Sequence, residues 1–148
     1  HRREDPREDP SSTVFGGPTK HKRVFSYAEF RIQCSHFGPE PVEGAMLQEN
    51  GARGVAAQDS PLLAVPLPIN VRVDRSACSE FLLLSELCVA WGSRGSLEAS
   101  GTGPITGTLR LYSTGPSCLS CLAALWQFRL RFPELRLEVA FAVLQGAL

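Results

Sequence analysis

Three cysteines and one glutamate have the residue types and the spacing needed for metal chemistry. Cys118 and Cys121 are three positions apart in PSCLSC, and Cys78 lies two positions before Glu80 in CSE. A cysteine pair at this spacing can form a redox disulfide, supply half of a zinc site, or pack as two small apolar side chains. Because neither a redox pair nor simple packing accounts for the C-x-E segment, we interpret these residues as one metal site.

The cysteines are expected at the starts of two helices. Asp74 or Ser76 can cap a first helix, whose apolar residues follow helical spacing as far as Trp91. A second helix is expected over residues 117–132, and Pro133 ends it. The side chains of this second helix that are expected to face the core are Leu122, Leu125, Trp126, Phe128 and then Leu130 or Phe132. A stacking surface for bases is the alternative reading of the aromatic residues.

Strand-like segments alternate with these helices. Apolar and β-branched residues predict strands at residues 23–32, 62–73, 108–113 and 135–144. Proline cannot donate to a β-ladder, so the second strand should be irregular near Pro66 and Pro68, with residues 69–73 its cleaner part. The order strand, helix, strand, helix, strand after residue 62 predicts an α/β sheet that is at least partly parallel.

The other segments are expected to be less regular. Residues 1–20, in which REDP occurs twice, are expected to be a disordered tail or linker. Residues 21–148 are expected to form one domain. Residues 36–60 are interpreted as loop with a short helix near residues 45–49, and the Gly/Ser-rich residues 92–106 as a linker.

An open α/β sheet would bring the cysteines together. In such a sheet both helix starts lie beyond the carboxyl ends of the strands, at the same edge. The thiolates of Cys118 and Cys121 would share one helix face, and Cys78 would add a third ligand from the neighbouring helix. Three protein ligands leave one position of a zinc ion open, as in catalytic sites. Glu80 then stands where a zinc deaminase has its general acid and base.

Two blocks of the sequence carry a resemblance to a known family. CSEFLLLSEL, followed by GTLRLYSTGPSCLSCLAALWQFRLRFPELRLEVAF, resembles the cytidine deaminase superfamily. The second block is most similar to the deaminase domains at the C-terminal ends of bacterial polymorphic toxins. The resemblance covers roughly residues 69–143. It implies a three-layer α/β/α sandwich with a mixed sheet of about five strands, in which Cys78, Cys118 and Cys121 hold zinc and Glu80 relays protons.

The resemblance also implies a substrate and a biological setting. Asn70, at the end of an expected strand, would contact the sugar or its phosphate, and Ser117 would bind substrate beside the metal. The expected reaction is hydrolytic deamination of cytosine in nucleic acid, with single-stranded DNA favoured over duplex DNA or RNA. The expected protein is a monomeric bacterial effector that is secreted, acts in the cytoplasm of a target cell and has an immunity protein as a partner.

Two departures from the family's pattern leave other functions open. The first ligand is Cys78, where the nucleic-acid branches mostly have His, and Pro116 is followed by Ser117 and not directly by a ligand. Because three cysteines are what many free cytidine or nucleotide deaminases use, that activity is an alternative. Another alternative is an inactive deaminase-like binding module, in which Cys34 or His36 closes a structural zinc site.

The composition is that of an ordinary globular protein. Of the 148 residues, 43% are apolar, and 15 Lys and Arg balance 15 Asp and Glu, at a pI of about 7.0. A protein that coats nucleic acid by bulk charge is usually strongly basic, so a nucleic acid would have to meet a local patch such as Arg129, Arg131 and Arg136. Five cysteines are an odd number, which fits a disulfide framework poorly. No apolar run approaches the ~20 residues that span a membrane.

Overall fold

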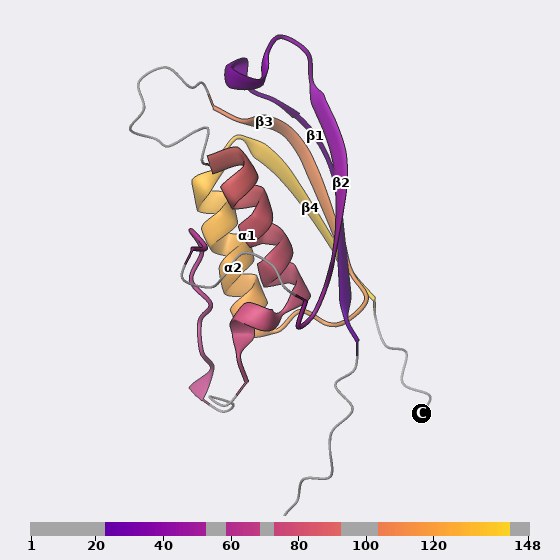
Figure 1. Cartoon of the computed structure of the whole chain (residues 1–148), viewed down its shortest axis with the longest axis vertical. Coiled ribbons are helices and arrows are strands. Elements are labelled where there is room, and N and C mark those ends of the chain that lie inside the picture. Colours follow the sequence, from indigo (N-terminus) through magenta and orange to yellow (C-terminus); the bar gives the residue numbers. More distant parts are fainter. Residues whose placement is uncertain (1–22, 53–58, 69–72, 93–103, 143–148) are drawn as a thin grey trace, which may run out of the picture.

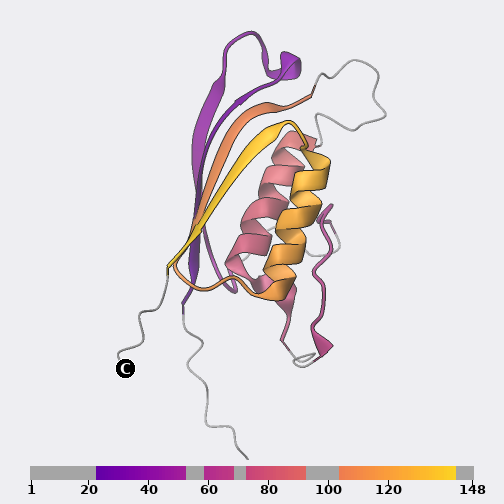
Figure 2. The same ribbon diagram turned by 180° about the vertical axis from the view of Figure 1, so that it is seen from behind.

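The computed structural model describes residues 23–52, 59–68, 73–92 and 104–142 (Figure 1). In this part of the chain a four-stranded sheet carries two α-helices on one face, as views from opposite sides show (Figure 1, Figure 2). The strands are β1 (Phe25–Gln33), β2 (Val42–Glu49), β3 (Thr106–Ser113) and β4 (Leu135–Phe141). The helices are α1 (Ser79–Gly92) and α2 (Leu119–Arg131), with the short 3-10 helices η1 (Ser35–Phe37) and η3 (Arg75–Ala77).

The sheet is mixed, with the strand order β2-β1-β3-β4. β1 lies between β2 and β3 and is antiparallel to both, whereas β3 and β4 are parallel. Parallel neighbours require a crossover connection, and α2 provides it between β3 and β4. The prediction of an α/β fold with a partly parallel sheet is therefore confirmed. The described residues contain four strands and one layer of helices. The finer prediction, a sheet of about five strands in three layers, therefore stays a prediction.

The core lies between the two helices and the face of the sheet that they cover. Alternate residues of β1 point to the helices, so that Ser26, Ala28 and Ile32 are buried between exposed neighbours. Helix α1 is enclosed on nearly all sides, since residues 79–85 are buried without a break. Because the start of α1 packs against neighbours on nearly every side, this packing fixes the position and the direction of the helix.

An aromatic cluster fills the core at the C-terminal ends of both helices. Trp91 in α1 meets Phe30 of β1 and Phe132 after α2 edge to face, at ring-centroid distances of 5.3 and 5.6 Å. Phe128 of α2 lies 4.8 Å from Phe132 and 6.0 Å from Trp91. Such aromatic pairs add about 0.5–1.5 kcal/mol each beyond their buried area. The cluster therefore holds the ends of the two helices against β1.

The predicted core face of α2 was right for Leu125, Phe128 and Phe132, which are buried, and wrong for the other three residues. Leu122, Trp126 and Leu130 are 44%, 66% and 65% exposed. The side chains of α2 that are buried are Ser120, Cys121, Ala124, Leu125 and Phe128. Because α2 has apolar residues on two faces, helical spacing alone does not choose between them, and packing selected the face with the small residue Ala124. In the edge strand β4 only Leu135 is buried, and the other residues are partly buried or exposed.

The strand expected at residues 62–73 is absent from the part of that segment that the structure describes. Residues 62–68 have no regular strand, and Leu63 is tied to α2 through both of its backbone groups, which bond Gln127 at 2.8 and 3.0 Å. Pro66 and Pro68 explain the irregular backbone, as neither can donate to a ladder. Residues 69–72, the tail at 1–20 and most of the linker at 92–106 lie outside the described residues.

β2 corrects the prediction of a loop with a short helix at residues 45–49. Its sequence VEGAMLQE consists mostly of residue types that favour a helix. The segment nevertheless pairs with β1 along its whole length, from Phe25 opposite Glu49 to Ile32 opposite Val42. Pairing with the preceding strand outweighs local propensity here, as is common in sheets.

Gly44 allows β2 to pass under the ring of Phe30. The two residues are register partners, and a Cβ on Gly44 would lie 2.5 Å from Phe30 Cζ. Coverage of an edge-strand glycine by an aromatic ring on the neighbouring strand is a known way to hold strand register. The same ring also packs on Trp91 and has little freedom to move away.

We predict that Gly44→Ala lowers the free energy of unfolding by about 1–3 kcal/mol, the usual cost of overpacking. Urea unfolding followed by circular dichroism measures it. In a Phe30→Leu background the added methyl group has more room, and Gly44→Ala should cost clearly less there. Equal costs in the two backgrounds would mean that the ring of Phe30 does not select glycine at this position.

Candidate metal centre

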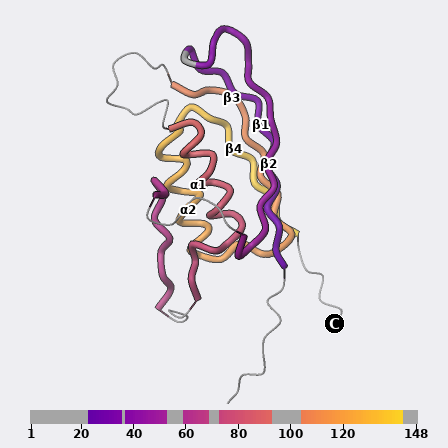
Figure 3. Tube along the Cα trace, viewed as in Figure 1, coloured from indigo at the N-terminus to yellow at the C-terminus, as the bar shows by residue number. Residues whose placement is uncertain are grey.

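The two α-helices begin at the same end of the sheet, and the candidate ligands lie at these two starts (Figure 1, Figure 3). Before α1, the side chain of Asp74 caps η3 by accepting the backbone N–H of Ser76 at 2.9 Å. Cys78 follows η3 in an extended conformation and directly precedes α1. Cys118 is the N-cap of α2, where its Sγ accepts the backbone N–H of Cys121 at 3.3 Å. Each ligand is thus placed by local helix-start geometry.

Three sulfur atoms form a compact set between the helix starts. The Sγ atoms of Cys78, Cys118 and Cys121 all lie within 4.8 Å of one another, and those of Cys118 and Cys121 are 3.3 Å apart. Zinc–sulfur bonds of about 2.3 Å in a tetrahedral site hold sulfur ligands about 3.8 Å apart. The observed separations therefore suit one metal ion. Within the described ranges, no other group of three or more His, Cys, Asp or Glu side chains lies close enough together to hold a metal ion.

The environment favours a thiolate at Cys78. A hydrogen bond from Cys121 lowers the pKa of Cys78 to about 7, although burial and the charge of Glu80 act to raise it. Weaker hydrogen bonds from Cys118 and Arg75 contribute to the same lowering of this pKa. The pKa of Cys121 is raised, because its proton bonds Cys78 and because the thiol is buried. Metal ions bind cysteine in its thiolate form. Near neutral pH a substantial fraction of Cys78 is therefore already in the form that binds a metal.

The carboxylate of Glu80 is buried beside the sulfur atoms. The residue is 4% exposed, and its Oε2 lies 3.6 Å from the Sγ of Cys121. Ser79 donates to Oε2 at 3.2 Å, and Ser113 donates to Oε1 at 3.3 Å. Both oxygens accept a hydrogen bond, as a buried carboxylate requires. A hydrogen-bonded carboxylate next to a potential metal position is the arrangement that proton relay needs.

Two polar atoms without partners flank the cysteines. Among the described residues, the buried side-chain nitrogen or oxygen atoms without a hydrogen-bond partner are Nε of Arg75 and Oγ of Ser117. Arg75 lies three positions before Cys78, and Ser117 directly precedes Cys118. A buried polar atom left unpaired costs about 1–3 kcal/mol, so a ligand that paired with either atom would recover part of that cost. Sequence reasoning selected Ser117 but missed Arg75, whose spacing from Cys78 was its only signal.

The structure brings together most of the site residues selected from the sequence. The residues that meet are Cys78, Glu80, Cys118 and Cys121, with Ser117 beside them. Their meeting follows from the two helix starts, as the spacing predicted. Asn70 lies outside the described residues. No sequence pattern pointed to Ser113, which contributes to the site from β3.

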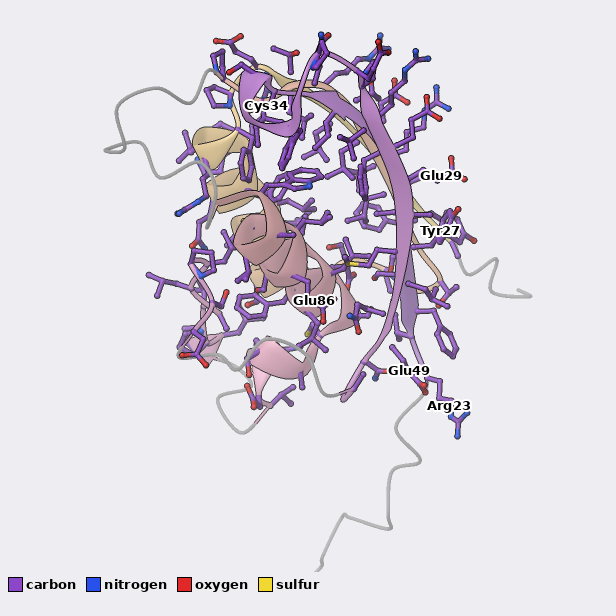
Figure 4. All side chains as sticks on the ribbon, turned by 45° about the horizontal axis from the view of Figure 1, so that its top comes forward. Arg23, Tyr27, Glu29, Cys34, Glu49 and Glu86 are labelled. Atoms are coloured by element: carbon purple, nitrogen blue, oxygen red, sulfur yellow. The ribbon has the colours of Figure 1, made fainter. Side chains whose placement is uncertain are left out.

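Cys34 lies too far away to complete the ligand set. It follows the end of β1, at the opposite end of the sheet from Arg23 (Figure 4). Ser26 is near the site, since it bonds Ser79, and Cys34 is eight positions further along the strand, about 26 Å at ~3.3 Å per residue. The side chain of His36 lies outside what the structure describes.

Comparison of the chain with models of protein families finds no match, and comparison with curated proteins finds none. Function is therefore inferred from the site itself and from the sequence resemblance described above. The described residues contain no helix that is both long and apolar enough to cross a membrane.

We predict that the chain binds one equivalent of Zn²⁺, or of Co²⁺ as a spectroscopic substitute, through the three cysteines. Replacing Cys78, Cys118 or Cys121 by Ser should remove stoichiometric binding and the sulfur-to-cobalt charge-transfer absorption. Cys88→Ala is the matched control. Cys88 is 1% exposed in the core, where burial raises its pKa to about 12, so its loss should leave metal binding unchanged.

A closed site with four protein ligands would give a different result. Loss of metal from Cys34→Ala, or from a variant of His36, would contradict an open coordination position. Retention of metal by both, together with loss from each of the three cysteine variants, is the expected pattern.

Proposed function

We propose that the chain is a zinc-dependent deaminase that acts on cytosine in a nucleic acid, with single-stranded DNA as the favoured substrate. One observation carries the proposal: a buried carboxylate, that of Glu80, lies 3.6 Å from one of three convergent cysteine sulfur atoms. Structural zinc sites are closed by four protein ligands and have no need of a carboxylate held beside them. The C-x-E and C-x-x-C spacing supports the same activity.

The residues present suit zinc. Cysteine sulfur is a soft donor, and three thiolates match the tetrahedral preference of zinc while leaving one position open. When bound, zinc would lower the pKa of a coordinated water to about 7 and so supply the nucleophile. Three thiolates and Zn²⁺ together carry one negative charge. The positive N-terminal ends of α1 and α2 and the guanidinium of Arg75 offset that charge.

Glu80 would move the protons in this reaction. Its carboxylate takes a proton from the water that attacks C4 of cytosine and delivers this proton to ring nitrogen N3. It then carries the second proton of that water to the exocyclic amine. The bond between C4 and this amine breaks, and ammonia leaves. Cytosine and water thus give uracil and ammonia, and Glu80 returns to its initial state.

Donors near the site support a polymer as the substrate. Arg75 and Ser117 each hold an unpaired polar atom beside the cysteines, suited to a phosphate or a base edge. Further along α2, towards the end of the sheet opposite the cysteines, Trp126 is 66% exposed and, with Arg129 and Arg136, lines a hollow of about 370 Å³. Exposed aromatic rings stack on bases, and arginine pairs with phosphate. With Trp126 outside the core, the stacking role becomes the better interpretation of this side chain.

The wider expectations from the resemblance belong to the same proposal. They are a three-layer α/β/α sandwich with about five strands, a role as a toxin effector, and an immunity protein as a partner. The mixed sheet of β2, β1, β3 and β4 is compatible with such a fold. A free cytidine or nucleotide deaminase is the second candidate, and the set of three cysteine ligands favours it.

We predict that the zinc-loaded chain forms uracil from cytosine in single-stranded DNA, and that Glu80→Gln lowers turnover by about 10²–10⁴-fold because the proton relay is lost. Uracil and inosine would be measured in single-stranded DNA, duplex DNA, RNA, free cytidine and free adenosine offered side by side. Glu86→Gln, a partly buried glutamate on the same helix, is the matched control and should keep full activity.

The possible results separate the candidates. Activity on free cytidine alone would select the second candidate. A zinc-bound chain that acts on none of the five substrates would contradict both enzymes and favour a binding module.

A further inference from the structure

Three fully buried serines surround the carboxylate of Glu80. Ser26 of β1, Ser79 of α1 and Ser113 of β3 each have 0% exposure. Ser26 and Ser113 are register partners on neighbouring strands, and both face the start of α1. A buried hydroxyl costs free energy unless it is hydrogen-bonded, so three of them in one place need common partners.

The hydroxyl protons of Ser79 and Ser113 are donated to Glu80, and that of Ser26 is donated to Ser79. Ser79 has one hydroxyl proton and donates it to Glu80 Oε2, so Ser26 must be the donor in the 2.8 Å bond between Ser26 and Ser79. Ser113 accepts the backbone N–H of Gly115 at 3.5 Å and donates to Glu80 Oε1 at 3.3 Å. Two chains of donors therefore end on the two oxygens of one carboxylate.

We infer that Ser113 is the positioning residue that aims Glu80, an inference that rests on the proposed function. Ser79 adjoins Glu80 in the chain and moves with it. Ser113 lies 33 positions away on β3 and ties the carboxylate to the sheet. With Oε1 held by β3 and Oε2 held by α1, the carboxylate plane cannot rotate. Oε1 keeps a second lone-pair direction that can accept a proton, whereas Oε2 also has the Sγ of Cys121 at 3.6 Å.

Small displacements of such a group have large effects on rate. A proton is transferred over heavy-atom distances of about 2.6–3.2 Å, and a misplacement of about 1 Å can cost ~10²-fold. Ser113→Ala removes the donor to Oε1 and leaves the carboxylate anchored on one side only. The metal ligands do not touch Ser113 in any hydrogen bond of the described structure, so metal binding should be unaffected.

The test compares Ser113→Ala, Ser113→Thr, Ser26→Ala and Ser85→Ala in the zinc-loaded chain. Ser113→Ala should lower kcat by about 10–100-fold with KM and zinc affinity unchanged, the size of effect that outer supporting residues have at metal sites. Ser113→Thr keeps the hydroxyl and should restore much of kcat. Ser26→Ala removes only the outer donor of the second chain, so its effect should be smaller.

Ser85→Ala is the matched control. Ser85 is also 0% exposed and makes one serine–serine bond, to Ser60 at 2.8 Å, without contact to Glu80. Its replacement removes a buried hydroxyl of the same kind and should leave kcat unchanged. A loss of kcat in Ser85→Ala equal to that in Ser113→Ala would reduce the role of Ser113 to general packing and overturn the inference.

A second measurement does not depend on activity. In urea unfolding of the metal-free chain, Ser113→Ala should shift the midpoint downward when Glu80 is present and much less in a Glu80→Ala background, because the two side chains bond each other. Equal shifts in both backgrounds would contradict the bond on which the inference stands.

The outcomes also separate the inference from the proposed function. An active wild-type chain whose Ser113→Ala variant keeps full kcat would overturn the positioning role alone. A wild-type chain that is inactive on every substrate, with zinc bound, would overturn the proposed function and the positioning role with it.

Discussion

The buried carboxylate of Glu80 is the constraint on which the arrangement of this protein depends. A carboxylate removed from water costs several kcal/mol unless hydrogen bonds replace its hydration. The donors here come from Ser79 on α1 and from Ser113 on β3. They can reach the carboxylate only if the start of α1 lies over the end of β3. Hydrogen bonding of the Glu80 carboxylate therefore fixes the start of α1 over the end of β3. The position of Cys78, which directly precedes α1, is fixed with it.

The cysteine set depends on the direction of the two helices. α2 is the crossover between the parallel strands β3 and β4, and it begins at the same end of the sheet as α1. Cys78 and Cys118 precede these two helices, so the positive ends of two helix dipoles point toward the sulfur atoms. A thiolate is favoured there, and metal binding and helix geometry support each other. A reversed α2 would separate Cys118 from Cys78 by the length of a helix.

The polar and apolar contacts of α1 are divided between its two ends. Glu80, near its start, is held by serine hydroxyls, and Trp91, near its end, is held by the rings of Phe30 and Phe132. Aromatic packing supplies stability at a distance from the cysteines. The unpaired atoms of Arg75 and Ser117, which are costly to bury, lie only at the polar end. Functional sites often lower the stability of a fold, and packing elsewhere offsets the loss. Here the aromatic end of α1 offsets the cost of the polar end.

The sequence by itself determined the local features: the two helix starts with their cysteines, the strands β1, β3 and β4, and the parallel crossover. Each depends on capping, on periodicity or on short spacing. Only the tertiary structure decided that VEGAMLQE is a strand, since its partner β1 overrides a helical preference. It also decided which face of α2 is buried, and it brought Ser113 to Glu80 and Ser26 to the neighbouring Ser79. Contacts between distant segments leave no periodic pattern, because each serine alone looks like any other small polar residue.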